Sequence, residues 1–565
     1  MEADIMDITM PSVKFKGNQN ILSLYGTSVF VFSITSLFPA CVYADLDIKA
    51  SAEAEMTFQD VNSEEQGELS LTTVSLLPKV NAIYESRTFS GTWTSSVTHL
   101  ERDKEINSRK DTYGEYSYSA NWAPFDRFIF FEASGGLTYQ NTDSSNYLVS
   151  DFLSNADSLS KTRTNRVAAQ AIIDRGDWVR AYGTASYSAL ESESSTTNTE
   201  NGLDNSTMQF SGSLQNSEHA QRFIWEFSGT YQDTERNQTS SNDYISRTAD
   251  GYVDTVFIEN WAFRITASHE ANQISNRIDT SSSTRKFNSY GAGLTYRQNA
   301  DRYISVTANS SDSEISDEGS DNFIGFDLQW ALSSRTSVAG SYGKRFYGDS
   351  ASADIKYNSK YFRTSLSYSE DVTNTSQLLT DFDNLGVFIC PTNSSSISDC
   401  FQPNSLSYTP SADEQFIQLT TQNVSFDDNI ILLKSTNFQA GYDFSRLTLA
   451  FSWRYDESNY LDEDRLRRTY SFGTTLAYKL GSYMYLNSNI TYANIEERSN
   501  SENIATGESD NWNASLGLER KIGRSLTTSI DYNYIEKSGD LNLGGQFGAN
   551  YTDQRITLSI IYNYM

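Results

Sequence analysis

The residues able to carry out acid–base, nucleophilic or metal chemistry are sparse in this chain. It has only three histidines, His99, His219 and His269. None of them has a partner at the spacing of a metal site or a catalytic triad. Serine is so frequent that a chance Ser–His combination carries no information. We therefore expect no enzymatic activity, no catalytic residues, no metal site and no cofactor.

The nearest approach to a cation site is an acidic run, Asp312–Asp321. Its acids depart from the spacing of an EF-hand loop, so a solvated loop is favoured over calcium binding. The whole chain is acidic, with a formal net charge of −29. Such a surface repels nucleic acid, which we exclude as a partner. The charge either allows divalent cations to bridge the loops to lipopolysaccharide phosphates or simply keeps large loops soluble.

The elements that must position any functional residue are β-strands. Tyr, Phe and Thr abound and Pro is scarce, a composition that suits strands. The clearest strand closes the chain: its apolar and polar residues alternate from Ile556 to Tyr564, with Ile561 as the one apolar exception on the polar face. The mean hydropathy of −0.52 does not conflict with a membrane barrel, because only alternate residues of such strands meet lipid.

Short connections divide the chain into alternating segments, and longer stretches rich in Ser, Asn, Asp and Glu separate the resulting hairpins. Short turns at one end and long loops at the other are typical of bacterial barrels. The short connections centre on Tyr84–Arg87, Pro124–Asp126, Asp174–Asp177, Glu218–Gln221, Glu259–Asn260, Ala300–Asp301, Ser333–Ser334, Asn358–Lys360, Phe444–Arg446, Lys479–Gly481 and Lys521–Gly523.

These segments predict an all-β fold, a transmembrane antiparallel up-and-down β-barrel of about 24 strands (22–26) over residues 45–565. The first strand is predicted at Leu46–Thr57 and the last at Tyr551–Tyr564. We expect short periplasmic turns, long extracellular loops and both termini in the periplasm. A soluble sandwich, jelly roll or solenoid would also alternate, but it would not expose so many aromatic residues.

The first 44 residues look like a signal peptide. Lys14 and Lys16 precede the apolar stretch 21–38, and small residues end at Ala44, after which we predict cleavage. Translation starts at Met1 or Met10. A single transmembrane anchor is the alternative. A signal peptide followed by a barrel indicates the outer membrane of a Gram-negative bacterium.

Cleavage would remove one of the three cysteines and leave Cys390 and Cys400, both in one loop. An even pair in an exported chain favours a disulfide. The pair lacks the CxxC spacing of redox proteins, so we interpret it as a staple within the loop. The loop, residues 374–429, is long enough to be functional. It either folds inward as a constriction or lies across the outer mouth.

The strand pattern also assigns charged residues to the lumen. Mixed charge among many Ser, Thr and Asn residues suits polar solutes such as saccharides, although a generically hydrated wall gives the same pattern. About 24 strands close into a cylinder roughly 45–50 Å across, too wide for side chains alone to fill. The lumen-facing candidates are Glu132, Glu226, Arg264, Asp327, Arg454, Glu519 and Asp531.

Three stretches give the chain a family resemblance. They are the early strand from Leu71 to Ala82, the segment from Asn429 to Trp453 that follows the long loop, and the final strand after Arg555. In these it resembles outer-membrane β-barrels associated with PEP-CTERM/exosortase systems, grouped with putative β-barrel porins of exopolysaccharide loci. The resemblance implies a role in the export of envelope polysaccharide or surface protein, and it carries over no catalytic residues. Met565 displaces the usual terminal aromatic residue by one position.

We therefore expect a conduit for exopolysaccharide export, gated by the long loop. A general diffusion porin is one alternative, and a closed structural or adhesive barrel is another. A TonB-dependent transporter is not expected, because only a few residues separate Ala44 from the first strand. The expected partners are outer-membrane lipid and lipopolysaccharide, the barrel-assembly machinery, and a periplasmic polysaccharide-export adaptor on a separate chain.

Overall fold

A computed structural model describes most of the chain from Asp45 to Tyr564. The signal peptide predicted over residues 1–44, its cleavage site and Met565 lie outside the described residues. The described ranges are 45–64, 67–104, 109–125, 128–147, 151–153, 156–193, 202–217, 219–220, 222–237, 242–276, 282–313, 321–380, 386–391, 397–403, 408, 410–411, 413–417, 419, 429–461, 463–500, 504–541 and 550–564.

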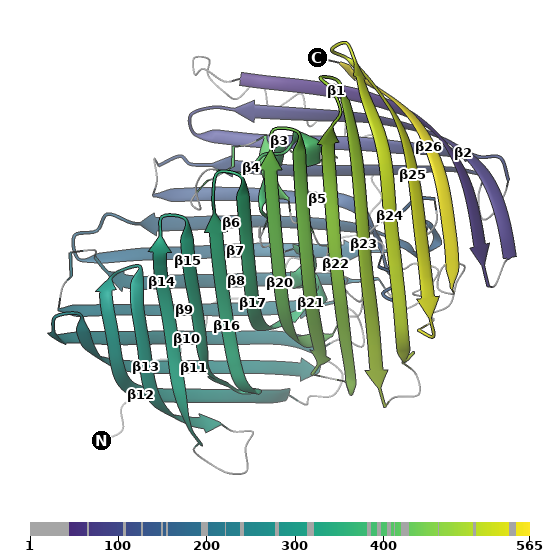
Figure 1. Cartoon of the computed structure of the whole chain (residues 1–565). Coiled ribbons are helices and arrows are strands. Elements are labelled where there is room, and N and C mark those ends of the chain that lie inside the picture. The colour runs from purple at the N-terminus through teal and green to yellow at the C-terminus, as the bar shows by residue number, and fades with distance from the viewer. Residues whose placement is uncertain are drawn as a thin grey trace, which may run out of the picture. The chain divides into compact units, whose positions relative to one another are not determined.

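One antiparallel sheet of 24 strands makes up the fold (Figure 1). Each strand of this sheet pairs with the next strand of the sheet along the chain, and β17 is followed by β20. The last strand, β26, pairs with β1, so the sheet closes into a ring. The first half of the ring consists of β1 (Asp45–Ser63), β2 (Gly67–Glu85), β3 (Phe89–Arg102), β4 (Lys110–Trp122), β5 (Ile129–Asn141), β6 (Leu159–Ile173), β7 (Val179–Ser192), β8 (Asp204–Asn216), β9 (Phe223–Arg236), β10 (Asn242–Ile258), β11 (Trp261–Asn276) and β12 (Ser282–Asn299).

The second half of the ring continues without a crossover until one long loop intervenes after β17. It consists of β13 (Arg302–Ser313), β14 (Asp321–Ser333), β15 (Thr336–Arg345), β16 (Gly348–Asn358), β17 (Phe362–Asn374), β20 (Ile430–Phe444), β21 (Leu447–Tyr460), β22 (Arg465–Lys479), β23 (Met484–Ser499), β24 (Gly507–Ile522), β25 (Leu526–Gly539) and β26 (Tyr551–Tyr564).

The remaining elements are short and lie in loops. η2 (Ala156–Ser158) precedes β6, and the loop between β17 and β20 holds α2 (Thr375–Thr380), β18 (Phe388–Pro391), η3 (Ile397–Asp399) and β19 (Glu414–Ile417). β18 and β19 pair with each other as a separate two-stranded sheet. None of the helices in the described residues is long and apolar enough to cross a membrane.

Every short connection predicted from the sequence joins two neighbouring strands at one end of the ring, called here the turn end. Asn260 shows why the sequence turns at these points. It adopts a positive φ of 65°, a conformation that Asn tolerates better than most residues, between β10 and β11. Gly523 does the same between β24 and β25, with a φ of 72°. The opposite end, the loop end, carries the longer connections, and the short links between β1 and β2 and between β15 and β16 are exceptions.

The two faces of the closed sheet differ in chemistry. Contacts between parts of the chain that are not neighbours around the ring mark the inner face. For example, Tyr147, in the loop before β6, donates a hydrogen bond to Ser471 on β22. The other face presents large apolar side chains such as Phe223, Phe227 and Ile530, which are about half exposed. A continuous apolar belt of this kind is stable in lipid and not in water. The predicted transmembrane antiparallel β-barrel and its strand number are therefore confirmed.

Candidate functional site

The charged residues predicted to face the lumen all lie on the inner face of the sheet. Each alternates along its strand with an exposed apolar side chain on the outer face; Glu226 precedes Phe227 and Asp531 follows Ile530. The same alternation places the others: Glu132 beside Phe131, Arg264 beside Phe263, Asp327 beside Phe326, Arg454 beside Trp453, and Glu519 beside Leu518.

Three of these residues meet near the turn end around a buried arginine. Arg264 donates two hydrogen bonds to Asp254, from Nε to Oδ1 at 2.7 Å and from Nη2 to Oδ2 at 2.8 Å. Its Nη1 lies 3.3 Å from Asp327 Oδ2, and its guanidinium carbon lies 4.1 Å from the centre of the Tyr252 ring. Tyr252 donates its hydroxyl to Glu226. The group ties β9, β10, β11 and β14 together.

The other candidates lie in separate polar groups. Arg454 donates to Asp456 on its own strand at 2.6 Å. Asp531 lies close enough to Glu53 and Glu55 on β1 to interact with them electrostatically. The sequence analysis missed Glu53, Glu55 and Asp254. Their signal was present, because all three alternate with outward-facing residues in predicted strands.

Opposite walls of the barrel meet directly at the loop end. Ile430 on β20 packs against Tyr244 on β10 and Ile274 on β11, and all three are buried. Nearby, Arg345 on β15 forms a two-point ion pair with Glu270 on β11, with Nη2 to Oε1 at 2.8 Å. The expectation that the lumen is too wide for side chains alone to fill is therefore wrong at this level, because side chains of non-neighbouring strands meet there.

The long loop, residues 374–429, enters the interior with its first described element, α2. In α2, Leu379 packs against Leu190 and Leu203, which lie at the loop end of β7 and just before β8. Gln377 accepts a hydrogen bond from Gln232 on β9 at 3.1 Å. These strands are not neighbours of β17 in the ring, so α2 lies inside the barrel near its loop end, between two parts of the wall.

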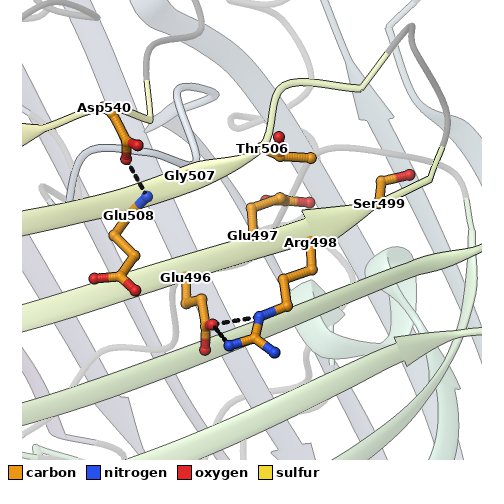
Figure 2. A pocket seen from close by; sticks show the side chains of 8 residues that line it. All are labelled: Glu496, Glu497, Arg498, Ser499, Thr506, Gly507, Glu508 and Asp540. Carbon is orange, nitrogen blue, oxygen red and sulfur yellow. Dashed lines mark hydrogen bonds and ion pairs between the residues drawn. The ribbon is translucent and has the colours of Figure 1, made fainter.

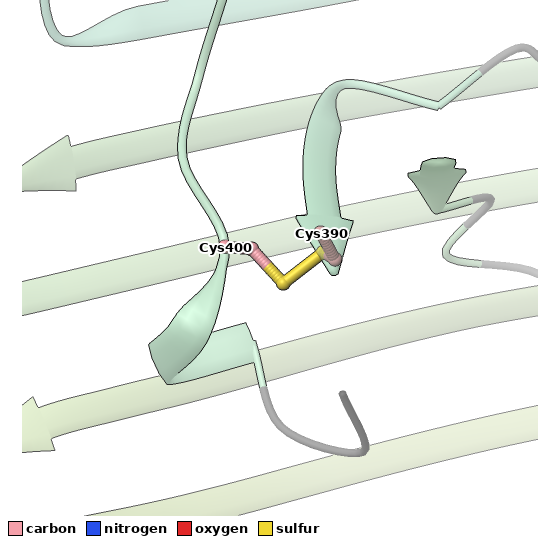
Figure 3. The surroundings of a disulfide bond; sticks show 2 residues. All are labelled: Cys390 and Cys400. Atoms are coloured by element: carbon pink, nitrogen blue, oxygen red, sulfur yellow. A yellow bond between two sulfur atoms is a disulfide. The ribbon is translucent and has the colours of Figure 1, made fainter. Parts of the chain in front are cut away.

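The loop then forms a small apolar body that the disulfide holds together (Figure 3). Cys390 in β18 is bonded to Cys400, which follows η3. Val387 and Phe388 are fully buried, and together with both cysteines they pack onto Ala450 of the β21 wall. Among the described residues, the long loop therefore folds inward, the first of the two arrangements expected from the sequence.

This body extends to the turn end of the barrel. Asn358, the last residue of β16, donates to Pro403 O at 2.9 Å, and the Arg363 guanidinium lies 5.4 Å from the Phe416 ring. Lys521 forms an ion pair with Asp399 at 3.3 Å. The loop leaves the wall at Asn374, eleven residues from Arg363 along β17, which corresponds to roughly 35 Å. The described parts of the loop therefore contact the inner wall near both ends of the barrel.

Loss of the disulfide is expected to loosen this body without unfolding the barrel. Replacing Cys390 and Cys400 by Ala should destabilise the loop by about 2–3 kcal/mol, because a short closed ring no longer restricts its unfolded state. We expect faster protease cleavage within the loop and unchanged heat-induced unfolding of the barrel. An unchanged cleavage rate would mean that wall contacts alone hold the loop in place.

A second loop enters the lumen between β5 and β6. Its described tip, residues 143–147 and 151–153, is called here the tip segment. Ser145 is fully buried, and its carbonyl oxygen accepts hydrogen bonds from Ser509 and Asn511 on β24. Phe152 stacks on Tyr113 of β4 with 4.2 Å between ring centres. The tip segment therefore lies inside the barrel and reaches β24, which is not a neighbour of β5 or β6 in the ring.

Few described residues resemble a reaction centre. His99 contacts Thr112 and His269 contacts Asn288, each pair on neighbouring strands. His219 lies in the connection between β8 and β9. No group of three or more His, Cys, Asp or Glu side chains among the described residues is arranged to hold a metal ion.

A cleft of about 470 Å³ opens at the loop end of β23, β24 and β25 (Figure 2). Its lining includes four acidic side chains, and protein groups already neutralise or bind three of them. Glu496 pairs with Arg498, Glu497 pairs with Arg465, and Asp540 accepts the main-chain N–H of Glu508. Its lining is therefore consistent with an ordinary solvated rim.

Comparison with known proteins adds no family assignment. No protein-family model and no curated protein sequence matches this chain. Among solved structures, the siderophore receptor PirA of Pseudomonas aeruginosa shares 9% identity over 92% of this chain and 80% of its own, with a TM-score of 0.35. The FrpB iron transporter of Neisseria meningitidis (F5-1 variant) shares 8% identity over 92% and 83%, with a TM-score of 0.44. The loop-deleted OmpT of Vibrio cholerae shares 9% identity over 92% and 99%, with a TM-score of 0.29. Values this low assign no ligand or activity to this chain.

Proposed function

We propose that this chain is an outer-membrane channel, a conduit for exopolysaccharide export that its own long loop holds shut. The observation that carries the proposal is the position of the loop's described residues, which lie inside the barrel at α2 near the loop end and at Asp399 and Pro403 near the turn end. A barrel with this many strands is wide enough for an aqueous channel, so an internal stopper is needed to keep it closed.

The lining of the barrel supports a polar cargo. Inward-facing Glu132, Glu519 and Asp531 are joined on the wall by many Ser, Thr and Asn side chains. Hydroxyl and amide groups exchange hydrogen bonds readily with water and with sugar hydroxyls, so a hydrated glycan would pass along this part of the wall without strong binding. The cargo passes without covalent chemistry, and we assign no catalytic residue.

The setting follows from the same proposal. We place the turn end and both termini in the periplasm and the loop end outside the cell, with lipid and lipopolysaccharide around the apolar belt. The chain would belong to the barrels of PEP-CTERM/exosortase systems that it resembles. The barrel-assembly machinery would insert it, and a periplasmic adaptor on another chain would deliver the polysaccharide.

Conductance in a planar bilayer tests this proposal. We expect the intact protein to be silent and a variant lacking residues 376–428, with a short Gly–Ser linker, to show large steps. A variant lacking residues 195–200, in the connection between β7 and β8, is the control and should stay silent. Large steps from the intact protein would identify an open diffusion porin. Silence from both proteins, with folding verified, would favour a closed structural barrel.

A further inference from the structure

Four cationic side chains line the inner wall at the loop end, in a chain whose net charge is −29. Arg102 on β3, Arg467 on β22, Lys537 on β25 and Arg555 on β26 are all at most 6% exposed. We call this group the basic seat. Carboxylates of the wall pair with two of the four cations, Arg102 with Asp111 and Arg555 with Asp553. Arg467 and Lys537 add further positive charge to the seat.

The tip segment lies on the basic seat. Every cation of the seat donates to an oxygen atom of that segment, through main-chain carbonyls, a hydroxyl and a carboxylate. Charge-assisted hydrogen bonds of this type are stronger than neutral ones. The bonds are Arg102 to Phe152 O at 2.9 Å, Arg467 to Ser144 O, Lys537 to Ser145 Oγ at 2.6 Å, and Arg555 to Asp151 Oδ2 at 2.6 Å.

We propose that the basic seat binds an acidic polysaccharide that carries carboxylate groups, and that the tip segment occupies the seat while the channel is closed. The tip segment then stands in for the glycan, because it presents oxygen acceptors to the same donors. This inference rests on the proposed channel function and names the chemical class of its cargo.

The extent of the seat favours a polymer over a small anion. Its cations lie on strands from β22 through β26 and β1 to β3, roughly 30 Å along the wall. Ser509 and Asn511 lie between them on β24 and supply neutral donors. Tyr113 would offer a ring face once Phe152 has left it. A chain of sugars with repeated carboxylates would meet several of these groups, and a single phosphate ion would meet one or two.

The binding test uses a variant in which the tip segment is released: Asn146→Ala, Tyr147→Ala and Asp151→Ala together. The probe is a hexamer of galacturonate, and maltohexaose is the neutral control of equal length. By calorimetry in detergent, we expect the released variant to bind galacturonate about tenfold or more tighter than the intact protein, which corresponds to ~1.4 kcal/mol, and to bind maltohexaose no better.

A matched pair of substitutions locates the site. In the released variant, Lys537→Met should weaken galacturonate binding about tenfold, because one charge-assisted bond is lost. Lys79→Met, which removes an inner-face lysine of β2 outside the seat, should leave it unchanged. If the triple variant does not fold, replacement of residues 143–153 by a Gly–Ser turn provides the same test.

Three results would overturn the inference. They are equal affinity for the neutral hexamer, competition by inorganic phosphate as effective as that by the oligomer, and equal losses from Lys537→Met and Lys79→Met. The measurement needs no conducting pore, so a failure of the channel proposal leaves it interpretable. Conversely, a failure to bind galacturonate leaves the conductance result of the loop deletion intact.

Discussion

We expect Asp254→Ala to lower the free energy of unfolding by about 3–5 kcal/mol, because the substitution leaves a buried arginine without its principal counter-charge. Asp254 is fully buried and Arg264 is 1% exposed. The same carboxylate also accepts hydrogen bonds from Arg297 at 3.0 Å and Thr295 at 3.3 Å. Removal of the carboxylate therefore takes a hydrogen-bond acceptor away from Arg264, Arg297 and Thr295.

Urea unfolding in lipid vesicles, followed by tryptophan fluorescence, would measure this loss. Asp327→Ala is the matched control, since it removes a carboxylate from the same arginine. Asp327 is 46% exposed in its side chain and makes one 3.3 Å contact with Arg264, so its loss should cost less than about 1 kcal/mol. Equal effects from the two variants would mean that water hydrates Arg264 and that the buried pair adds little.

The strand framework was predictable because it follows from local rules. A membrane barrel needs an apolar residue at every second position, and its hairpins need residues that tolerate tight turns, as at Asn260 and Gly523. Both signals are contained within about ten to fifteen residues of sequence. For the same reason the inner or outer face of a residue such as Glu519 was predictable: it depends only on the parity of its position within the strand.

Pairings within one hairpin depend on the exact register as well as on the turn. Asp254 and Arg264 pair directly across the hairpin of β10 and β11. Reflection of the chain about the predicted turn at Glu259–Asn260 would place Asp254 opposite Ile265, whose side chain faces outward. A one-residue register shift near the turn places Asp254 opposite Arg264 instead, and the sequence pattern did not reveal that shift.

Contacts across the lumen could not be predicted in this way. Ile430 meets Tyr244, and Arg345 meets Glu270, from strands that are not neighbours. A period of two specifies which face a side chain occupies and contains no information on how far apart two walls lie. The inward path of the long loop depends equally on tertiary packing, in which Phe388 and the disulfide find a matching place on β20 and β21.

Gly441 on β20 leaves the space into which Phe388 of the long loop packs. A substitution at Gly441 therefore tests whether this packing keeps the channel closed. A Cβ atom at this position would lie 2.5 Å from Phe388 Cε2 and 2.3 Å from Gln402 Nε2, closer than atoms of a folded protein approach. Gly441→Val should therefore displace Phe388, which is fully buried in the native loop. Loss of that burial costs about 1.5–3 kcal/mol, while Val itself is favourable within a strand.

We expect the Gly441→Val protein to conduct in a planar bilayer nearly as well as the variant lacking residues 376–428, although it keeps the whole loop. Gly343→Val on β15 is the control, because a Cβ atom there meets nothing nearer than Phe323 Cε2 at 3.9 Å, and it should stay silent. The barrel should unfold at the same temperature in both variants. Conductance that appears without loss of barrel stability would establish that the loop closes the channel and can leave the wall while the barrel stays folded. A silent, folded Gly441→Val protein would show that the packing of Phe388 against β20 does not control closure.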